Sequence, residues 1–187
     1  MLPPRGRGLP LADWLVLCLI SEGPTHGFAI AALLARDGSL GRVWHVDKPV
    51  IYRAAQRLEH RGLITVSEKQ PSRRGAALAR LQVTPEGRHA ADEWLRQPVR
   101  HPRDIRSELL VKLALLDRAG ADPRKLLRAQ RGQLAPTADA LASGLRTATG
   151  QDQALALWRH ESVSATLRFL DALLATMPAQ RAGTASG

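Results

Sequence analysis

Apolar and polar positions in the first forty or so residues predict two short helices. Residues 11–21 are almost uniformly apolar, which predicts a buried helix that Gly23 and Pro24 terminate. Thr25 is a favourable N-cap residue, so we expect a second helix over residues 25–36. The Gly-containing stretch at residues 37–41 then opens a loop.

The clearest amphipathic pattern covers residues 47–61. Asp47 suits an N-cap, Pro49 suits the first turn, and Gly62 signals the helix end. One face carries the apolar positions Ile51, Ala54, Ala55 and Leu58. Arg53, Arg57 and Arg61 lie four residues apart, so they share a stripe on another side of the same helix.

Two alternating segments, residues 63–66 and 79–83, follow this helix and predict a β-hairpin. The intervening residues 67–78 include Lys69, Arg73 and Arg74, so we expect a basic tip. Thr84 and Pro85 then form a typical N-cap and N1 pair for a helix that ends near residue 96.

The second half of the chain predicts helices only, at residues 104–118, 122–147 and 152–176. Two prolines within residues 97–103 indicate a domain boundary. We therefore divide the chain into five parts. They are a flexible arm at 1–8, an N-terminal domain of helices and hairpin at 9–97, a linker at 98–103, a C-terminal helical domain at 104–178 and a disordered tail at 179–187.

The order of three helices, a hairpin and a fourth helix is the plan of a winged helix-turn-helix. The expected fold class is therefore mostly α, with a small β-hairpin wing and a C-terminal helical dimerisation domain. A major groove about 12 Å wide admits one α-helix, so the helix at 47–61 would be the one that enters it.

Charge supports a nucleic-acid partner. The 187 residues contain 27 Lys and Arg against 17 Asp and Glu, a net charge of +10. Genomic base composition could explain why arginine outnumbers lysine, but it does not explain the net charge. A basic excess of this size favours a polyanionic partner, most simply double-stranded DNA.

Other classes of protein find little support in the sequence. A single cysteine, Cys18, excludes an intrachain disulfide and cysteine-based zinc sites. The histidines lack metal-ligand spacing, and neither a nucleophile elbow nor a phosphate-binding loop is found. We expect no enzyme activity, no metal and no cofactor. The longest apolar run, residues 14–20, is too short for a membrane span, so we expect a cytoplasmic protein without a membrane partner.

Four motifs in order make the chain similar to the PadR-like family of transcriptional regulators. They are Thr25-His26-Gly27-Phe28, Val46-Asp47-Lys48-Pro49-Val50-Ile51-Tyr52, Arg57-Leu58-Glu59-His60-Arg61-Gly62-Leu63-Ile64 and Leu81-Gln82-Val83-Thr84-Pro85-Glu86-Gly87. The resemblance covers about residues 11–96 and implies that Tyr52 contacts the DNA backbone. Lys48, Pro49 and Val50 depart from the family pattern, and Phe28 stands where the family usually has tyrosine.

The candidate DNA-binding residues lie on the third helix and the hairpin: Lys48, Val50, Tyr52, Arg53, Arg57, Lys69, Arg73 and Arg74. The alternative is a solvated basic helix face. Arg61 could equally complement the helix dipole. We expect Trp94 to be a packing residue, although some family relatives bind aromatic molecules near tryptophans.

The last helix carries two apolar strips. Leu155, Trp158, Ala165, Phe169 and Ala172 follow a coiled-coil-like spacing and are the candidate dimerisation residues. The alternative is burial of both strips inside one monomeric bundle. A two-fold dimer would place two recognition helices about one DNA turn apart.

The sequence therefore predicts a dimeric, sequence-specific DNA-binding regulator that represses by occluding a promoter. The resemblance implies that a small aromatic effector of unknown identity releases it. The alternative is a winged-helix module that binds a protein or RNA without operator specificity, because a fold alone does not fix function.

Overall fold

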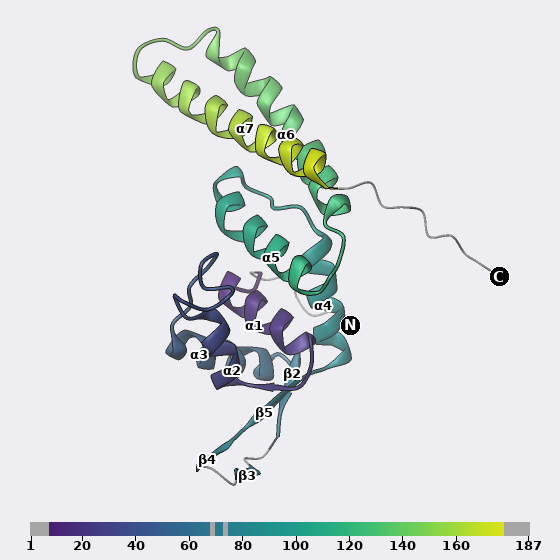
Figure 1. The fold of residues 1–187 in the computed structure, drawn as a ribbon. Coiled ribbons are helices and arrows are strands. Elements are labelled where there is room, and N and C mark those ends of the chain that lie inside the picture. Colours follow the sequence, from purple (N-terminus) through teal and green to yellow (C-terminus); the bar gives the residue numbers. More distant parts are fainter. Residues whose placement is uncertain (1–7, 68–69, 73–74, 178–187) are drawn as a thin grey trace, which may run out of the picture. The chain divides into compact units, whose positions relative to one another are not determined.

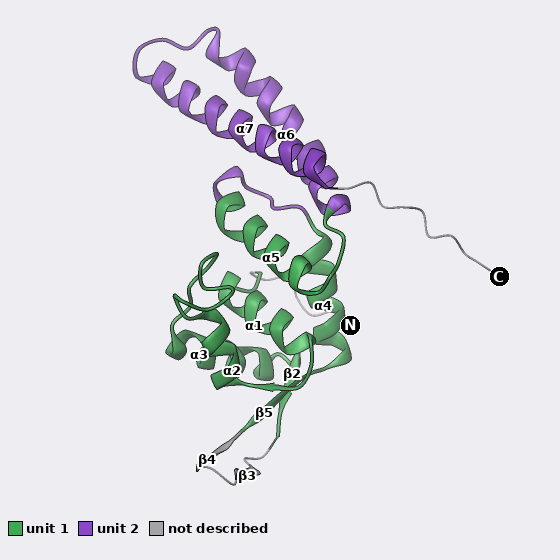
Figure 2. Cartoon of the chain, in the orientation of Figure 1, with its two compact units in different colours: residues 1–97, 104–123 green, residues 98–103, 124–187 purple. Residues whose placement is uncertain are grey.

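The computed structural model describes residues 8–67, 70–72 and 75–177, and for residues 70–72 and 75–78 it describes the backbone alone. The arm expected at 1–8 therefore lies outside the described residues except for Gly8, and the tail expected at 179–187 lies wholly outside them. The chain forms two units, one of residues 1–97 and 104–123 and the other of residues 98–103 and 124–187 (Figure 2).

Unit 1 is built around α1 (Leu11–Ser21), which packs against α3 (Lys48–His60) and α4 (Pro85–Arg96) (Figure 1). Every side chain from Leu15 to Ile20 is buried, as the uniform apolar pattern predicts. A helix with apolar residues on all sides needs neighbours on all sides. This is why α1 occupies the centre of the core.

The second helix begins later than expected. Thr25 is not an N-cap, because Thr25–His26 forms strand β1, which pairs with β5 (Arg80–Val83) in the register Thr25↔Leu81. The His26 ring also hydrogen-bonds the Ala79 carbonyl, with Nδ1 at 3.1 Å from the oxygen. Helix α2 therefore starts at Gly27 and spans Gly27–Leu34, with no side-chain cap.

The predicted hairpin is confirmed. Strand β2 (Ile64–Val66) pairs antiparallel with β5, Ile64 opposite Val83, and the sheet order is β1-β5-β2. Beyond them, β3 (Gln70–Ser72) and β4 (Gly75–Leu78) form a separate two-stranded sheet. Figure 1 shows this second pair beyond the ends of β2 and β5.

The Thr-Pro-Glu-Gly motif starts α4 as predicted. The Thr84 hydroxyl oxygen accepts a hydrogen bond from the Gly87 backbone N–H at 3.1 Å, and it donates to the Gly62 carbonyl at 2.8 Å. A Cβ on Gly87 would lie 1.9 Å from the Leu63 carbonyl oxygen. Glycine is therefore required here because the first turn of α4 lies against the backbone that leads into β2.

The chain after α4 departs from the expected boundary. A 3₁₀ turn (Pro102–Asp104) and a π-helical turn (Ile105–Leu109) lead into α5 (Leu110–Arg118). Val111 and Leu115 of α5 join the core around α1, and Arg118 pairs with Glu22 at 2.8 Å. Residues 104–123 thus belong to unit 1, whereas the sequence assigned residues 104–118 to the C-terminal helical domain.

Unit 2 is a helical pair, α6 (Arg124–Leu145) and α7 (Gly150–Thr176). The buried Gln130 side chain holds Val99 through both backbone groups, accepting from its N–H at 2.6 Å and donating to its carbonyl at 3.1 Å. This pairing explains why residues 98–103, expected to be a linker, pack with α6. None of the helices described is long and apolar enough to cross a membrane.

Candidate nucleic-acid interface

Helix α3 has two chemically distinct faces. Ile51, Ala54, Ala55 and Leu58 are buried, as the spacing predicts. Its exposed side chains are mostly basic or polar, with one acidic residue and one proline among them: Lys48, Pro49, Tyr52, Arg53, Gln56, Arg57, Glu59 and His60. A shallow depression of about 310 Å³ lies on this face, lined by Arg53, Gln56, Arg57, His60 and Arg61. Gln56 and His60 were missed from sequence, although their spacing from Arg53 and Arg57 already placed them on the same side.

The start of α3 is held by the loop before it. Asp47 occupies the N-cap position, but its side chain does not cap the helix, contrary to expectation. Its carboxylate instead lies 3.0 Å from His45 Nε2, while His45 Nδ1 lies 3.0 Å from the Leu34 carbonyl oxygen. The loop is thereby fastened to the end of α2, which fixes where α3 begins.

Tyr52 lies where α2 and α3 meet and is 50% exposed. Its ring covers Gly27, because a Cβ there would come 2.8 Å from Tyr52 Cε1. Glycine at the first position of α2 therefore allows the tyrosine to lie flat against the helix end. This contact orients the phenol while leaving half of the side chain accessible.

A second exposed aromatic residue, Phe28, follows Gly27 in the first turn of α2. Phe28 is 60% exposed, and the Lys48 ammonium nitrogen lies 5.4 Å from its ring centroid, a cation–π distance. Phe28 was not among the predicted site residues. Its place as the last residue of the first motif, Thr25-His26-Gly27-Phe28, was the available signal.

Val50 is less exposed than the other candidate DNA-binding residues of α3, and its role in binding stays a prediction. The residue is half-buried and packs against the core cluster. Its side chain thus helps to pack the first turn of α3 against the core. It presents less exposed surface to an external partner than Lys48 or Arg53, which are both exposed.

Arg57 is engaged inside the protein. Its Nε and Nη2 donate to the two carboxylate oxygens of Asp13 at 2.8 and 2.6 Å. Asp13 is completely buried, whereas the Arg57 side chain is 42% exposed. The hydrogen bond with Asp13 raises the pKa of the Arg57 guanidinium. Sequence gave no sign of this pairing across 44 residues.

The predicted basic residues of the hairpin, Lys69, Arg73 and Arg74, lie outside the residues whose side chains are described. Their role in binding stays a prediction.

Trp94 is a packing residue, as expected. It is 6% exposed and stacks on Trp14, with ring centroids 5.3 Å apart. The Lys112 ammonium lies 4.6 Å from the Trp94 centroid and pairs with Glu108 at 2.7 Å. Burial lowers the pKa of Lys112. These contacts fill the space around Trp94 with protein.

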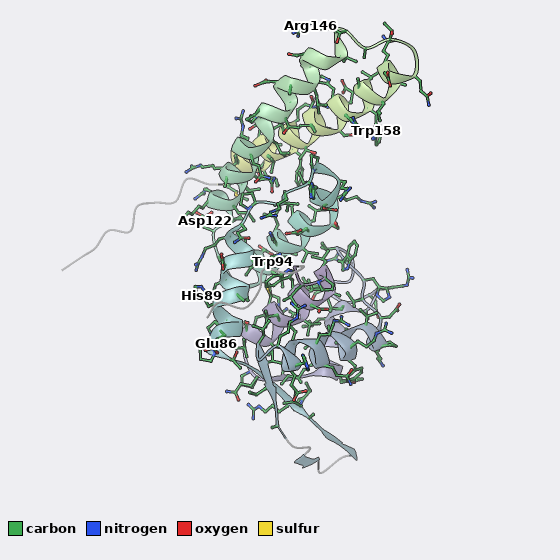
Figure 3. The ribbon with its side chains drawn as sticks, turned by 180° about the vertical axis from the view of Figure 1, so that it is seen from behind. Glu86, His89, Trp94, Asp122, Arg146 and Trp158 are labelled. Atoms are coloured by element: carbon green, nitrogen blue, oxygen red, sulfur yellow. The ribbon has the colours of Figure 1, made fainter. Side chains whose placement is uncertain are left out.

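The five candidate dimerisation residues are all exposed on α7 of this single chain: Leu155, Trp158, Ala165, Phe169 and Ala172. Trp158, labelled in Figure 3, is 71% exposed. Val163 and Leu170 are the buried residues of the same helix. At 100° per residue, the exposed strip lies on the side of α7 roughly opposite the buried one.

The described residues contain no group of histidine, cysteine, aspartate and glutamate side chains that could hold a metal ion. Helices α1 to α4 with the sheet β1-β5-β2 define a winged helix-turn-helix, so the predicted fold class is confirmed. The class that fold and site define is thus a winged-helix protein with a basic recognition helix.

Residues 16–93 match the model of the Transcriptional regulator PadR-like family. The match confirms the resemblance that the sequence motifs predict, and it spans the second half of α1, the whole of α2 and α3, the strands and most of α4. Residues 16–93 are therefore similar to the winged-helix part of the Transcriptional regulator PadR-like family.

Solved structures similar to the chain include Bacillus subtilis PadR in complex with operator DNA, at 16% identity and a TM-score of 0.47, covering 91% of this chain and 100% of that one. The same protein in complex with p-coumaric acid shares 17% identity at a TM-score of 0.42, over 90% and 97% of the two chains. A PadR-like regulator of Bacillus cereus, BC1756, shares 18% identity at a TM-score of 0.39, over 88% and 96%. A search of curated proteins found no significant match.

Proposed function

We propose that this protein is a sequence-specific DNA-binding regulator whose α3 enters the major groove. The observation that carries the proposal is the division of α3 into a buried apolar face and an exposed side on which basic, amide and phenol groups outnumber the single carboxylate of Glu59. Arginine and lysine pair with phosphates and guanine edges, and glutamine pairs with adenine. The family match over residues 16–93 supports the same partner.

Lys48, Tyr52 and Arg53 are the α3 residues proposed to touch DNA. Lys48 and Tyr52 lie in the first turns of the helix, the part of a recognition helix that reaches base edges and flanking phosphates. The phenol hydroxyl of Tyr52 is suited to donate to a phosphate oxygen. Lys69, Arg73 and Arg74 are proposed to contact the neighbouring backbone or the minor groove from the hairpin.

We further propose that the protein acts as a homodimer through the exposed strip of α7. Leu155 and Phe169 are 47% and 38% exposed, and Trp158 is 71% exposed. Large apolar side chains that gather on one helix face favour burial against a partner. A two-fold pair would present two α3 helices to successive major grooves of a pseudo-palindromic site.

The regulatory part of the proposal is repression by promoter occlusion, with release by a small aromatic effector. It rests on the family resemblance. A dimer seated across a promoter excludes polymerase without any chemistry. An effector that binds the DNA-free form better than the bound form would shift the population off the operator.

The test is a selection of duplexes from a random pool, followed by fluorescence anisotropy on the selected and a scrambled duplex. We expect affinity for the selected duplex at least about a thousandfold above the scrambled one, and a steep loss with added salt. Equal affinity for all duplexes, or a preference for single-stranded RNA, would favour the interaction-module alternative instead.

A further inference from the structure

Helix α1 contains one charged side chain, and that side chain is buried. Asp13 has no exposed surface, whereas every other residue of α1 except Ser21 is apolar. An acidic residue in the first turn suits the helix dipole, but the dipole does not require burial. The position of Asp13 therefore needs a second explanation.

The explanation lies across the core, on α3. Arg57 Nε is 2.8 Å from Asp13 Oδ2, and Arg57 Nη2 is 2.6 Å from Oδ1. This is a two-point contact between a planar guanidinium and a planar carboxylate, which fixes direction as well as distance. The pair joins the central helix of unit 1 to the helix proposed to enter DNA.

The apolar face of α3 constrains the rotation of the helix about its own axis less tightly than the Arg57–Asp13 contact does. Ile51, Ala54, Ala55 and Leu58 hold the helix against the core, but apolar packing is non-directional. A bidentate ion pair on the flank of that face adds a directional constraint. For stability alone an apolar pair of similar volume would serve as well, since desolvation offsets the attraction between buried charges.

The charges around Arg57 and Arg53 support the same conclusion. The carboxylate of Asp13 lies against the guanidinium of Arg57 and compensates its charge inside the protein. Arg53, on the same stripe, has an exposed side chain on the face that carries Lys48 and Tyr52. A phosphate thus meets more uncompensated charge at Arg53 than at Arg57.

We infer that Asp13 and Arg57 form a positioning pair that fixes the rotation of α3, and that Arg57 is not itself a DNA contact. The inference rests on the proposed DNA-binding function. It revises the sequence-based expectation for Arg57. It also makes Asp13, a buried residue that no duplex can reach, a determinant of DNA specificity.

The test compares Asp13→Asn, Arg57→Met and the double variant Asp13→Leu/Arg57→Met, with Arg53→Met as the matched control. The readouts are the affinities of the full chain for the selected and scrambled duplexes from 50 to 300 mM salt. A thermal melt by circular dichroism accompanies each variant.

We expect Asp13→Asn to lower affinity for the selected duplex about tenfold, the scale of one lost base-pair contact, with little change on the scrambled duplex. Arg57→Met should behave similarly and keep the salt slope of the wild type. The double variant should melt near the wild-type temperature, because it leaves no unpaired buried charge, but it should not regain the lost affinity, because an apolar pair supplies no directional constraint. Arg53→Met should instead reduce the slope of log K against log salt by about one.

Wild-type affinity in Asp13→Asn would overturn the inference. So would a slope reduced by about one in both Arg57→Met and the double variant, because that result identifies Arg57 as a phosphate contact. If the single variants melt below the assay temperature, the double variant alone is decisive. Its slope of log K against log salt then shows whether the loss of Arg57 removes a phosphate contact. Failure of the wild type to discriminate between duplexes would overturn the proposed function and this inference with it, whereas the other outcomes leave the function standing.

Discussion

The exposed phenol of Tyr52 depends on a glycine in another helix. Gly27 has no side chain, and the Tyr52 ring occupies the space that a Cβ would need, 2.8 Å from Cε1. The tyrosine ring is at the end of a side chain that can move aside. A substitution at Gly27 therefore acts on the orientation of Tyr52 more than on the core.

We predict that Gly27→Ala lowers affinity for the selected duplex several-fold, about the effect of one weakened phosphate contact. Anisotropy titration measures it. Gly23→Ala is the matched control, since nothing lies within 4 Å of a Cβ at Gly23. Unchanged affinity in Gly27→Ala would separate Tyr52 from DNA binding.

Cys18 offers a second test at this scale. Burial is the main cause that raises its pKa from 9.0 to about 12. Near pH 8 the folded protein should then carry about a thousandfold less thiolate than the unfolded chain, and only the thiolate reacts readily. Iodoacetamide labelling followed by mass spectrometry should be fast in urea and very slow without it. Comparable rates in both conditions would contradict the buried position of α1.

Among the elements, those with a strong local pattern were predicted well. Leu11–Ser21 was predicted at its observed bounds, and the observed bounds of α3 and α4 lie within a residue or two of the expected ones, because apolar periodicity and Pro or Thr start signals agree there. The predicted helix start at Thr25 was wrong, because Thr25 pairs with Leu81 in the sheet and this outweighs its N-cap preference. Leu81 lies 56 positions away, so no local pattern reveals the contact.

Thr84 is the residue on which the start of α4 depends. Its hydroxyl makes two hydrogen bonds, to Gly87 and to Gly62. We expect Thr84→Ala to lower the free energy of unfolding by about 1–2 kcal/mol, and Thr84→Ser to retain most of it. Urea denaturation followed by circular dichroism measures both. Equal loss in the two variants would mean that the methyl group, and not the hydroxyl, matters here.

At the scale of the whole molecule, sequence predicted the winged helix but misjudged which residues follow it. The two prolines near residue 100 lie in a segment, residues 98–103, that belongs to unit 2, yet α5 packs in the core of unit 1 through Val111 and Leu115. Both residues fit a helical apolar pattern that would suit either unit. The Asp13–Arg57 pair was hidden for a similar reason, since a lone acid in the first turn of a helix already has a local explanation.

The proposed dimer surface predicts a difference between two residues of equal exposure. Leu155 and Leu157 are both 47% exposed, but they point about 200° apart around α7. We expect Leu155→Glu to shift the protein toward monomer in sedimentation velocity and Leu157→Glu to leave the dimer intact. If Leu157→Glu alone dissociates the protein, the exposed strip on α7 is not the dimer interface.

The salt dependence of specific binding tests the central claim, that the exposed face of α3 reads duplex DNA, most directly. Anisotropy of the full chain on the selected duplex, wild type against Arg53→Met, supplies the measurement. The account predicts a steep negative slope for the wild type and a slope shallower by about one unit for the variant. Identical slopes, or equal affinity for selected and scrambled duplexes, would contradict it.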